Sequence, residues 1–370
     1  YTRYPKKGEV AAGEEMYNRH VFYHVLGSKP EGDPLIFGKG RDPQEWPGVG
    51  LSNDGRWLLV AAYQGWTKSE LFVREAKSEG DFTPVTEGKN FIYNAEIYNG
   101  DLYIMTNEDA PRYRVFKVAA ANPARANWKE IIPQTDAVLT ATKVIGGKLF
   151  AEYEKNASSQ LKVFTTAGKF LKDVKLPTIG TILGLGGEWD SKEAFYGFQS
   201  YTVPPTIYHY PLATGVSTQW AKVDAPSVDS SAYQVKQVWF LSKDGTKVPM
   251  FVVAKRGLIL DGKNPTLLTG YGGFNVSSTP AFRRGVYLWL EHGGVFAEAN
   301  MRGGAEFGED WHRAGMLGNK QNVFDDFIAA AEFLISQKYT DKEHLAIQGG
   351  SNGGLLMGAA FTQRPDLYRA

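Results

Sequence analysis

Short apolar strands recur at a regular interval along the first part of the chain. One series begins at Leu58, Leu102, Leu149 and Ala194, which are 44, 47 and 45 residues apart. A second strand follows each, beginning at Leu71, Tyr113, Leu161 and Thr206, and a run from His20 matches this second series. A repeat of roughly 40 to 50 residues made of short strands is typical of β-propeller blades. The pattern therefore predicts part of a β-propeller over residues 1–225.

Turn signals lie where these strands must reverse. They are Asn53-Asp54-Gly55, Asn99-Gly100, Gly146-Gly147 and Ala167-Gly168. An all-β sandwich is the alternative, but sandwiches space their turns about 8 to 12 residues apart without a longer period. Four units and part of a fifth would leave strand edges unpaired, so we expect further blades before Tyr1.

A second pattern begins after the polar stretch Asp224-Ala225-Pro226-Ser227, which is typical of a linker. Residues 235–241 and 248–253 form a predicted hairpin, and short buried strands are expected at 266–268, 295–299 and 345–347. Residues 322–337 carry apolar positions at helical spacing: Phe324, Phe327, Ile328, Ala331, Leu334 and Ile335. Strands that alternate with helices predict a mostly parallel sheet in a domain over residues 226–370.

Composition and charge exclude several classes of protein. The 370 residues carry 41 basic and 40 acidic side chains, a formal charge of +1, so no basic surface for nucleic acid is expected. No apolar run approaches the roughly 18 residues of a membrane span. Cysteine is absent, which excludes disulfides, thiolate nucleophiles and Cys-ligated metals from this segment but does not fix the compartment.

The strongest chemical signal is Gly349-Gly350-Ser351-Asn352-Gly353, which fits G-x-S-x-G. It follows a predicted strand and precedes a helix-prone run, the context of a nucleophile elbow in an α/β-hydrolase. Two alternatives are a glycine-rich helix start that contains a serine and a phosphate-binding loop. The second lacks the lysine that such loops carry. The pattern therefore predicts that Ser351 is a nucleophile.

A serine nucleophile needs a histidine base and an acid that orients it. In α/β-hydrolases both follow the serine, whereas all six histidines of this chain precede Ser351. We expect structural roles in propeller strands for His20, His24 and His209, loop or helix-end positions for His312 and His344, and a helix terminus at His292. The catalytic Asp and His are expected beyond Ala370.

The developing oxyanion needs donors that are already in place. One is expected to be the backbone N–H of Asn352, the residue after the nucleophile. The loop at 270–274, Gly-Tyr-Gly-Gly-Phe, occupies the position of the second donor, and its glycines would allow close approach to a substrate.

Several motifs together resemble one family of serine peptidases. GYGGFN at 270–275, NMRGGAEFGEDWH at 300–312, KQNVFDDF at 320–327 and GGSNGG at 349–354 are similar to prolyl oligopeptidases. SKDGTKVPMF at 242–251 and the opening YTRYP add to this resemblance. It implies part of a seven-bladed β-propeller over residues 1–225 and the first portion of an α/β-hydrolase domain over residues 226–370.

By position, the resemblance implies a role for four residues. Ser351 would be the nucleophile, and Tyr271 would donate its phenolic O–H to the oxyanion alongside the N–H of Asn352. Phe274 would line the proline pocket, and the side chain of Asn352 would also contact substrate. The pocket Trp and the Arg that holds the substrate backbone would lie beyond Ala370. The loop Tyr63-Gln64-Gly65-Trp66 differs from that of animal relatives, so no propeller residue is assigned to the site.

The expected activity is hydrolysis of short peptides on the carboxyl side of proline through a Ser351 acyl-enzyme. The partners would be proline-containing peptides and the remaining polypeptide of the same enzyme, with no nucleic acid, no membrane, no cofactor and no metal. We expect a cytoplasmic monomer, although a periplasmic or secreted location stays open. The alternatives are an oligopeptidase B-like or acylaminoacyl peptidase-like specificity, and a non-catalytic propeller scaffold.

Overall fold

The computed structural model describes residues 1–225 and 228–370, which divide into two compact units, Tyr1–Gln134 and Thr135–Ala370. Pro226 and Ser227 of the expected linker lie outside the described residues. The proposed domain boundary between residues 225 and 226 falls inside the second unit and stays a prediction.

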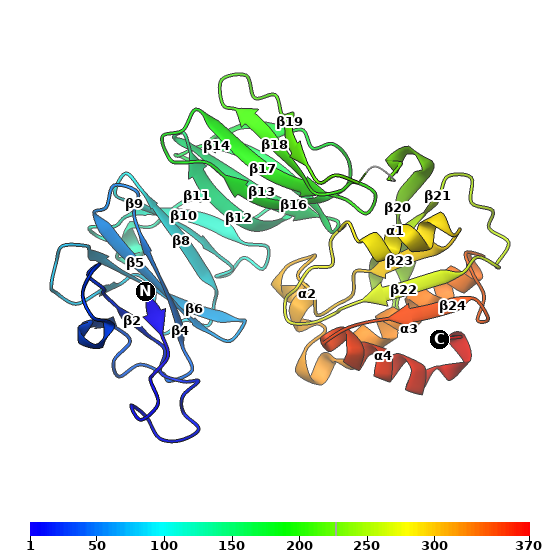
Figure 1. Cartoon of the computed structure of the whole chain (residues 1–370), viewed down its shortest axis with the longest axis horizontal. Helices are drawn as coiled ribbons and strands as arrows, with labels where there is room; N and C mark the ends of the chain where they lie inside the picture. The colour runs from blue at the N-terminus through cyan, green and yellow to red at the C-terminus, as the bar shows by residue number, and fades with distance from the viewer. Residues whose placement is uncertain (226–227) are drawn as a thin grey trace. The chain divides into compact units, whose positions relative to one another are not determined.

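The first unit consists of three antiparallel sheets in which each strand pairs with the next one along the chain (Figure 1). The first sheet contains β1 (Thr2–Arg3), β2 (His20–Phe22) and β3 (Leu35–Phe37). The second contains β4 (Trp46–Leu51), β5 (Trp57–Gln64), β6 (Lys68–Glu75) and β7 (Thr83–Pro84). The third contains β8 (Tyr93–Tyr98), β9 (Asp101–Thr106), β10 (Arg114–Ala119) and β11 (Lys129–Ile132). The sequential order of the two four-stranded sheets is that of propeller blades and not of a sandwich.

Two further blades open the second unit. One contains β12 (Val138–Ile145), β13 (Lys148–Lys155), β14 (Ser158–Thr165) and β15 (Phe170–Val174). The other contains β16 (Thr181–Gly186), β17 (Glu193–Gln199), β18 (Thr206–Pro211) and β19 (Thr218–Lys222). The two predicted strand series are thus the second and third strands of four blades.

The predicted hairpin turns are confirmed by backbone geometry. Asn99 and Gly100 have φ of 49° and 77°, and Gly146 and Gly147 have φ of 53° and 67°. Positive φ at both central residues defines the tight turn whose twist matches that of the flanking strands. Asn156 and Ala157 form another such turn, with φ of 52° and 60°, which carries no glycine for sequence reasoning to detect.

A mixed five-stranded sheet in the order β20-β21-β23-β22-β24 completes the second unit. Its strands are β20 (Tyr233–Leu241), β21 (Lys247–Lys255), β22 (Thr266–Gly270), β23 (Val295–Ala299) and β24 (Leu345–Gln348). β22 pairs in parallel with both β23 and β24, whereas the β20–β21 hairpin is antiparallel. This arrangement confirms the predicted hairpin and the predicted parallel strands.

Helices cover both faces of this sheet (Figure 1). The long helices α3 (Gln321–Ser336) and α4 (Asn352–Gln363) lie on one face and α1 (Arg284–Glu291) on the other. Alternate residues of β21 point to the two faces, and both sets are apolar because both faces are buried. The bounds of α1 and α2 (Glu309–Arg313) were not predicted, although a helix end was expected at His292, because each helix is too short to show a clear helical period.

The most buried face of α3 differs slightly from the predicted one. Phe327, Ala331 and Leu334 are fully buried as expected, and Val323 and Ala330 join them. The other predicted positions, which flank this stripe, are only partly buried: Phe324, Ile328 and Ile335.

The two blades of the second unit are tied to the sheet by packing and by a buried hydrogen bond. The side chain of Ala157, at the tip of the β13–β14 hairpin, is buried in one apolar cluster with Phe251 of β21. The Tyr201 hydroxyl donates to Glu298 of β23 at 2.5 Å, and the Arg283 guanidinium donates to the same carboxylate at 3.0 Å. These contacts explain why the blades and the sheet form one compact unit. Among the described residues, no helix combines the length and apolar character needed to cross a bilayer.

Candidate active site

Ser351 lies on a sharp bend between β24 and α4. Its backbone has φ 56° and ψ −123°, a conformation that costs a non-glycine residue about 1 to 3 kcal/mol. A Cβ on Gly349 would lie 2.3 Å from the carbonyl oxygen of Gly353, so the bend requires glycine at 349. The Ser351 side chain is exposed, whereas Asn352 and Gly353 beside it are buried. The sequence Gly349 to Gly353 thus presents a serine hydroxyl to solvent at the start of a helix.

The loop after β22 packs closely against this bend. The Asn352 side chain donates from Nδ2 to the carbonyl oxygen of Tyr271 at 2.6 Å. A Cβ on Gly273 would lie 2.6 Å from the same amide group, and a Cβ on Gly272 would lie 2.3 Å from Val323. These two glycines therefore let the loop approach Asn352 and α3. The sequence showed these glycines, but it did not reveal this structural reason for them.

The predicted oxyanion donors come from two adjacent segments. As the first residue of α4, Asn352 has a backbone N–H without a carbonyl partner inside its own helix. Tyr271 belongs to the loop that the Asn352 side chain holds, and its side chain is partly exposed. Phe274 follows in the same loop with φ 55° and half of its surface exposed. The structure thus brings Tyr271, Ser351 and Asn352 together at the carboxyl ends of parallel strands. The substrate contacts of Phe274 and Asn352 stay predictions.

Lys320 is a further residue at this site that sequence reasoning did not assign. It precedes α3, and its Nζ donates to the carbonyl oxygen of Gly272 at 2.7 Å and to Oδ1 of Asn352 at 3.2 Å. Burial lowers the pKa of Lys320 below the ordinary value of a lysine. The only sequence signal was its place in the motif at 320–327, because its partners lie 32 and 48 positions away.

A buried ion pair supports the neighbouring loop. Arg302 and Asp326 are almost fully buried, and the guanidinium donates to the carboxylate from Nε and from Nη2. The other carboxylate partner of Arg302 is Asp244, in the β20–β21 hairpin. Burial opposes the charged form of Arg302, but the hydrogen bonds to Asp326 and Asp244 outweigh burial and raise its pKa. The same contact lowers the pKa of Asp244 to about 2. Removing one partner of such a pair leaves an uncompensated buried charge.

A second buried group of carboxyls lies where blade strand β13 contacts the loop after β23. Burial raises the pKa of Glu154 to about 7, and a hydrogen bond from Ser277 opposes that shift. Burial and then the charge of Glu154 raise the pKa of Glu306, whose carboxylate accepts the backbone N–H of Ser278 at 2.8 Å. Burial also raises the pKa of Glu152, two residues along β13, to about 7. The cluster therefore retains protons near neutral pH.

None of the imidazole hydrogen bonds involves Ser351 in the part of the chain that the structure describes. His209 lies in β18 and contacts Glu193, and His292 ends α1 with a contact to the Leu288 carbonyl, as expected. His312 is buried near the end of α2 beside Glu309, and His344 contacts Asp341 before β24. His20 lies in β2 as predicted.

The prediction that His24 lies in a propeller strand is wrong. β2 ends at Phe22, and His24 follows it in a loop. Its Nδ1 contacts the carboxylate of Asp33 at 2.9 Å. The apolar run after His20 suggested a longer strand. The backbone pairing of β2 ends before His24, which contacts Asp33 through its side chain instead.

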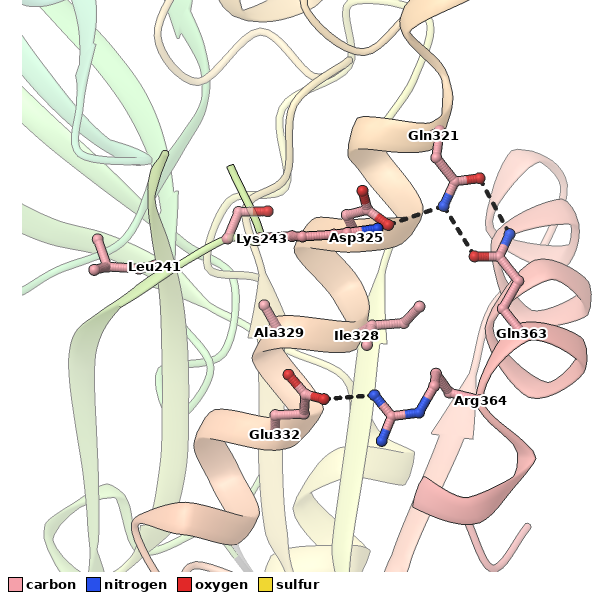
Figure 2. A pocket seen from close by; sticks show the side chains of 10 residues that line it. Leu241, Lys243, Gln321, Asp325, Ile328, Ala329, Glu332, Gln363 and Arg364 are labelled. Carbon is pink, nitrogen blue, oxygen red and sulfur yellow. Dashed lines mark hydrogen bonds and ion pairs between the residues drawn. The ribbon is translucent and has the colours of Figure 1, made fainter. Parts of the chain in front are cut away.

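A surface pocket of about 520 Å³ lies between the β20–β21 hairpin, α3 and α4 (Figure 2). Part of its polar lining is paired internally: Gln321 contacts Asp325 and Gln363, and Arg364 contacts Glu332. None of the predicted site residues lines this pocket. Across residues 1–225 and 228–370, no three His, Asp or Glu side chains form a group that could hold a metal.

The fold is that of an α/β-hydrolase with attached β-propeller blades. A family model described as the N-terminal β-propeller domain of prolyl oligopeptidase matches residues 1–223, and a model described as the prolyl oligopeptidase family matches residues 280–370. The chain therefore belongs to the prolyl oligopeptidase family. This membership confirms the predicted combination of a β-propeller with an α/β-hydrolase domain.

Individual relatives match along the full chain. A prolyl endopeptidase from Elizabethkingia meningoseptica is 42% identical over 100% of this chain and 52% of its own length. One from Dictyostelium discoideum is 35% identical over the same shares. The chain thus spans about half the length of the curated relatives it matches.

Solved structures agree with these matches. A structure from a study of two prolyl endopeptidases is similar with a TM-score of 0.94 at 46% identity, covering 100% of this chain and 54% of that one. Prolyl oligopeptidase B from Galerina marginata, bound to a macrocyclization substrate of 25 residues, has a TM-score of 0.91 at 29% identity. That similarity covers 98% of this chain and 52% of the fungal one.

Proposed function

We propose that the protein containing this chain is a serine endopeptidase that cleaves short peptides on the carboxyl side of proline. The observation that carries the proposal is the exposed Ser351 on its glycine-flanked bend, beside a loop that Asn352 holds in place. The similarity to prolyl endopeptidases supports the choice of substrate.

In this mechanism the Ser351 hydroxyl oxygen attacks the carbonyl carbon of the prolyl residue while a histidine base takes its proton. The carbonyl oxygen becomes an oxyanion that accepts hydrogen bonds from the Asn352 N–H and the Tyr271 phenol. The carbon–nitrogen bond then breaks, and the leaving amine takes the proton from the imidazole. Water hydrolyses the remaining Ser351 ester and restores the hydroxyl. We place the base and its acid partner outside this chain, because none of the six histidines contacts Ser351.

Phe274 would form an apolar wall for the proline ring. Proline is compact, apolar and without an N–H, so an aromatic side chain can bury it without leaving a donor unpaired. Half of the Phe274 surface remains exposed, which leaves area for such a contact. A cytoplasmic monomer is also part of the proposal, and cell fractionation together with light scattering of the purified protein tests it.

The proposal is tested with the full-length protein and three chromogenic peptides that present Pro, Arg or an acetylated amino acid at the cleavage site. We expect the Pro substrate to dominate and Ser351→Ala to lose about 10⁶-fold in kcat. Preference for Arg would favour an oligopeptidase B-like enzyme. A Ser351→Ala variant that keeps most of the rate would refute the assignment of the nucleophile.

A further inference from the structure

Lys320 connects the two segments that carry the proposed oxyanion donors. Its ammonium group donates to the carbonyl oxygen of Gly272, in the loop, at 2.7 Å. It also donates to Oδ1 of Asn352, at the bend, at 3.2 Å. The same Asn352 side chain donates from Nδ2 to the carbonyl oxygen of Tyr271 at 2.6 Å. Two consecutive carbonyl groups of the loop are thus held by one ammonium and one amide.

The surroundings of Lys320 favour strong hydrogen bonds. The lysine is partly buried, and it forms no ion pair with any carboxylate of the described residues. Its positive charge therefore acts on two neutral oxygens, and hydrogen bonds from a charged donor are roughly twice as strong as neutral ones. Gly272 and Gly273 have no side chains that would keep the loop away from Val323 and Asn352.

We propose that Lys320 is a positioning residue that holds the Tyr271 loop in register with Asn352, so that both oxyanion donors are in place before reaction. This inference rests on the proposed function. Donors stabilise a transition state only when their geometry is fixed in advance, and catalytic groups tolerate displacements of only about 0.5 Å. Lys320 contacts the loop and the bend, and it would act through them without touching substrate.

Loss of the ammonium group should lower kcat more than it changes KM. Removing an oxyanion donor itself costs about 10²- to 10³-fold in kcat. Loss of a residue that only orients such a group should cost less, about 10- to 100-fold. Substrate binding before attack does not use the oxyanion donors at full strength, so KM should stay within about twofold.

The test uses the full-length enzyme with Lys320→Met, Lys320→Arg and the control Lys342→Met, an exposed lysine just before β24. We measure kcat and KM with the Pro substrate, the rate of labelling by a fluorophosphonate probe, and Tm. The probe reports on the bend and its oxyanion donors independently of substrate preference. K320M should lose about 10- to 100-fold in kcat and in labelling rate, K320R should recover part of both, and K342M should match the wild type.

A folded K320M variant with wild-type kcat and labelling would overturn the inference, as would a change confined to KM. If K320M does not fold, Lys320→Gln decides, because its neutral amide cannot form charge-assisted bonds. Loss of labelling in folded K320Q supports the inference, and a wild-type rate refutes it. A wild-type protein that is labelled but ignores Pro peptides contradicts only the proposed specificity. A wild type that is not labelled contradicts the proposed function and this inference together.

Discussion

Positive φ at a blade hairpin and at the candidate site provides a comparison that separates local from long-range control of the backbone. At the Asn99-Gly100 hairpin the left-handed residues are types that adopt this conformation readily, and they only reverse the chain. At the edge of the hydrolase sheet Phe274 and Ser351 adopt positive φ although neither type favours it. There, the side chain of Asn352 donates to the carbonyl oxygen of Tyr271, and Lys320 donates to the carbonyl oxygen of Gly272 and to the side chain of Asn352. The blade turn and the glycine-flanked bend at Ser351 are encoded locally, whereas the Tyr271 loop is held by residues far apart in sequence.

Ala157 shows that this division does not simply follow the domains. It has φ 60° in a blade hairpin, yet its side chain is fully buried against residues of the hydrolase sheet. A surface that excludes this side chain from water helps to stabilise a turn that alanine disfavours by itself.

The largest effect is expected from Gly349→Ala, which changes the bend that presents Ser351 beside the Tyr271 loop. The added Cβ would lie 2.3 Å from the carbonyl oxygen of Gly353, so the bend must shift and move Ser351. We expect fluorophosphonate labelling to fall by about 10²-fold or more, because a displacement near 1 Å is enough for such a loss.

Gly350→Ala is the matched control for this prediction. The neighbouring glycine has no positive φ, and its added Cβ would meet no atom within 4 Å. Its labelling rate should stay close to that of the wild type. Equal losses at both positions would mean that the contact of Gly349 is not what shapes the bend.

A smaller effect is expected from Glu154→Gln. Glu154 belongs to blade strand β13, and its burial makes the stability of the folded protein depend on pH. The ordinary pKa of a Glu is 4.5, and burial raises that of Glu154 to about 7. The folded protein therefore holds a proton that the unfolded chain releases. The stability that this bound proton contributes is complete below pH 4.5 and is lost as pH rises through about 7. The total loss in the free energy of unfolding is about 3 kcal/mol. Burial also raises the pKa values of Glu152 and Glu306, and the charge of Glu154 raises both further.

Thermal unfolding of the full-length protein from pH 5 to pH 8 measures this effect. E154Q cannot ionise, so its Tm should fall less between these pH values than that of the wild type. The exposed Glu188→Gln serves as the control and should follow the wild type. If the Tm of the wild type and that of E154Q fell equally between pH 5 and pH 8, the result would contradict a buried Glu154 that is protonated in the folded protein.

The smallest effect is expected from Asn99→Ala, which tests the local side of the comparison. Alanine at positive φ costs about 1 kcal/mol, or about 2 to 4 °C in Tm for a domain of this size. Labelling of Ser351 should not change. Asn99→Gly should keep the wild-type Tm, and a change in labelling rate from either substitution would show that the turn is not purely local.

The sequence was sufficient for features that depend on neighbours along the chain. The blade strands, the Asn99-Gly100 turn, the β20–β21 hairpin, α3 and the Ser351 bend all follow from period, turn residues and glycines. The contact of Lys320 with Gly272 and the interaction of Glu154 with Glu306, in the loop after β23, could not be predicted, because they join positions 48 or more residues apart. The end of β2 before His24 was also missed, because apolar residues continue along the chain past Phe22, where strand pairing stops.

The most direct test of the central claim is to map the site of covalent modification in the full-length protein. After reaction with a fluorophosphonate, the protein is digested and the adduct is located by mass spectrometry. The account predicts one adduct, on Ser351, that is absent from the Ser351→Ala variant. An adduct on another residue, or an intact protein without any adduct, would contradict it.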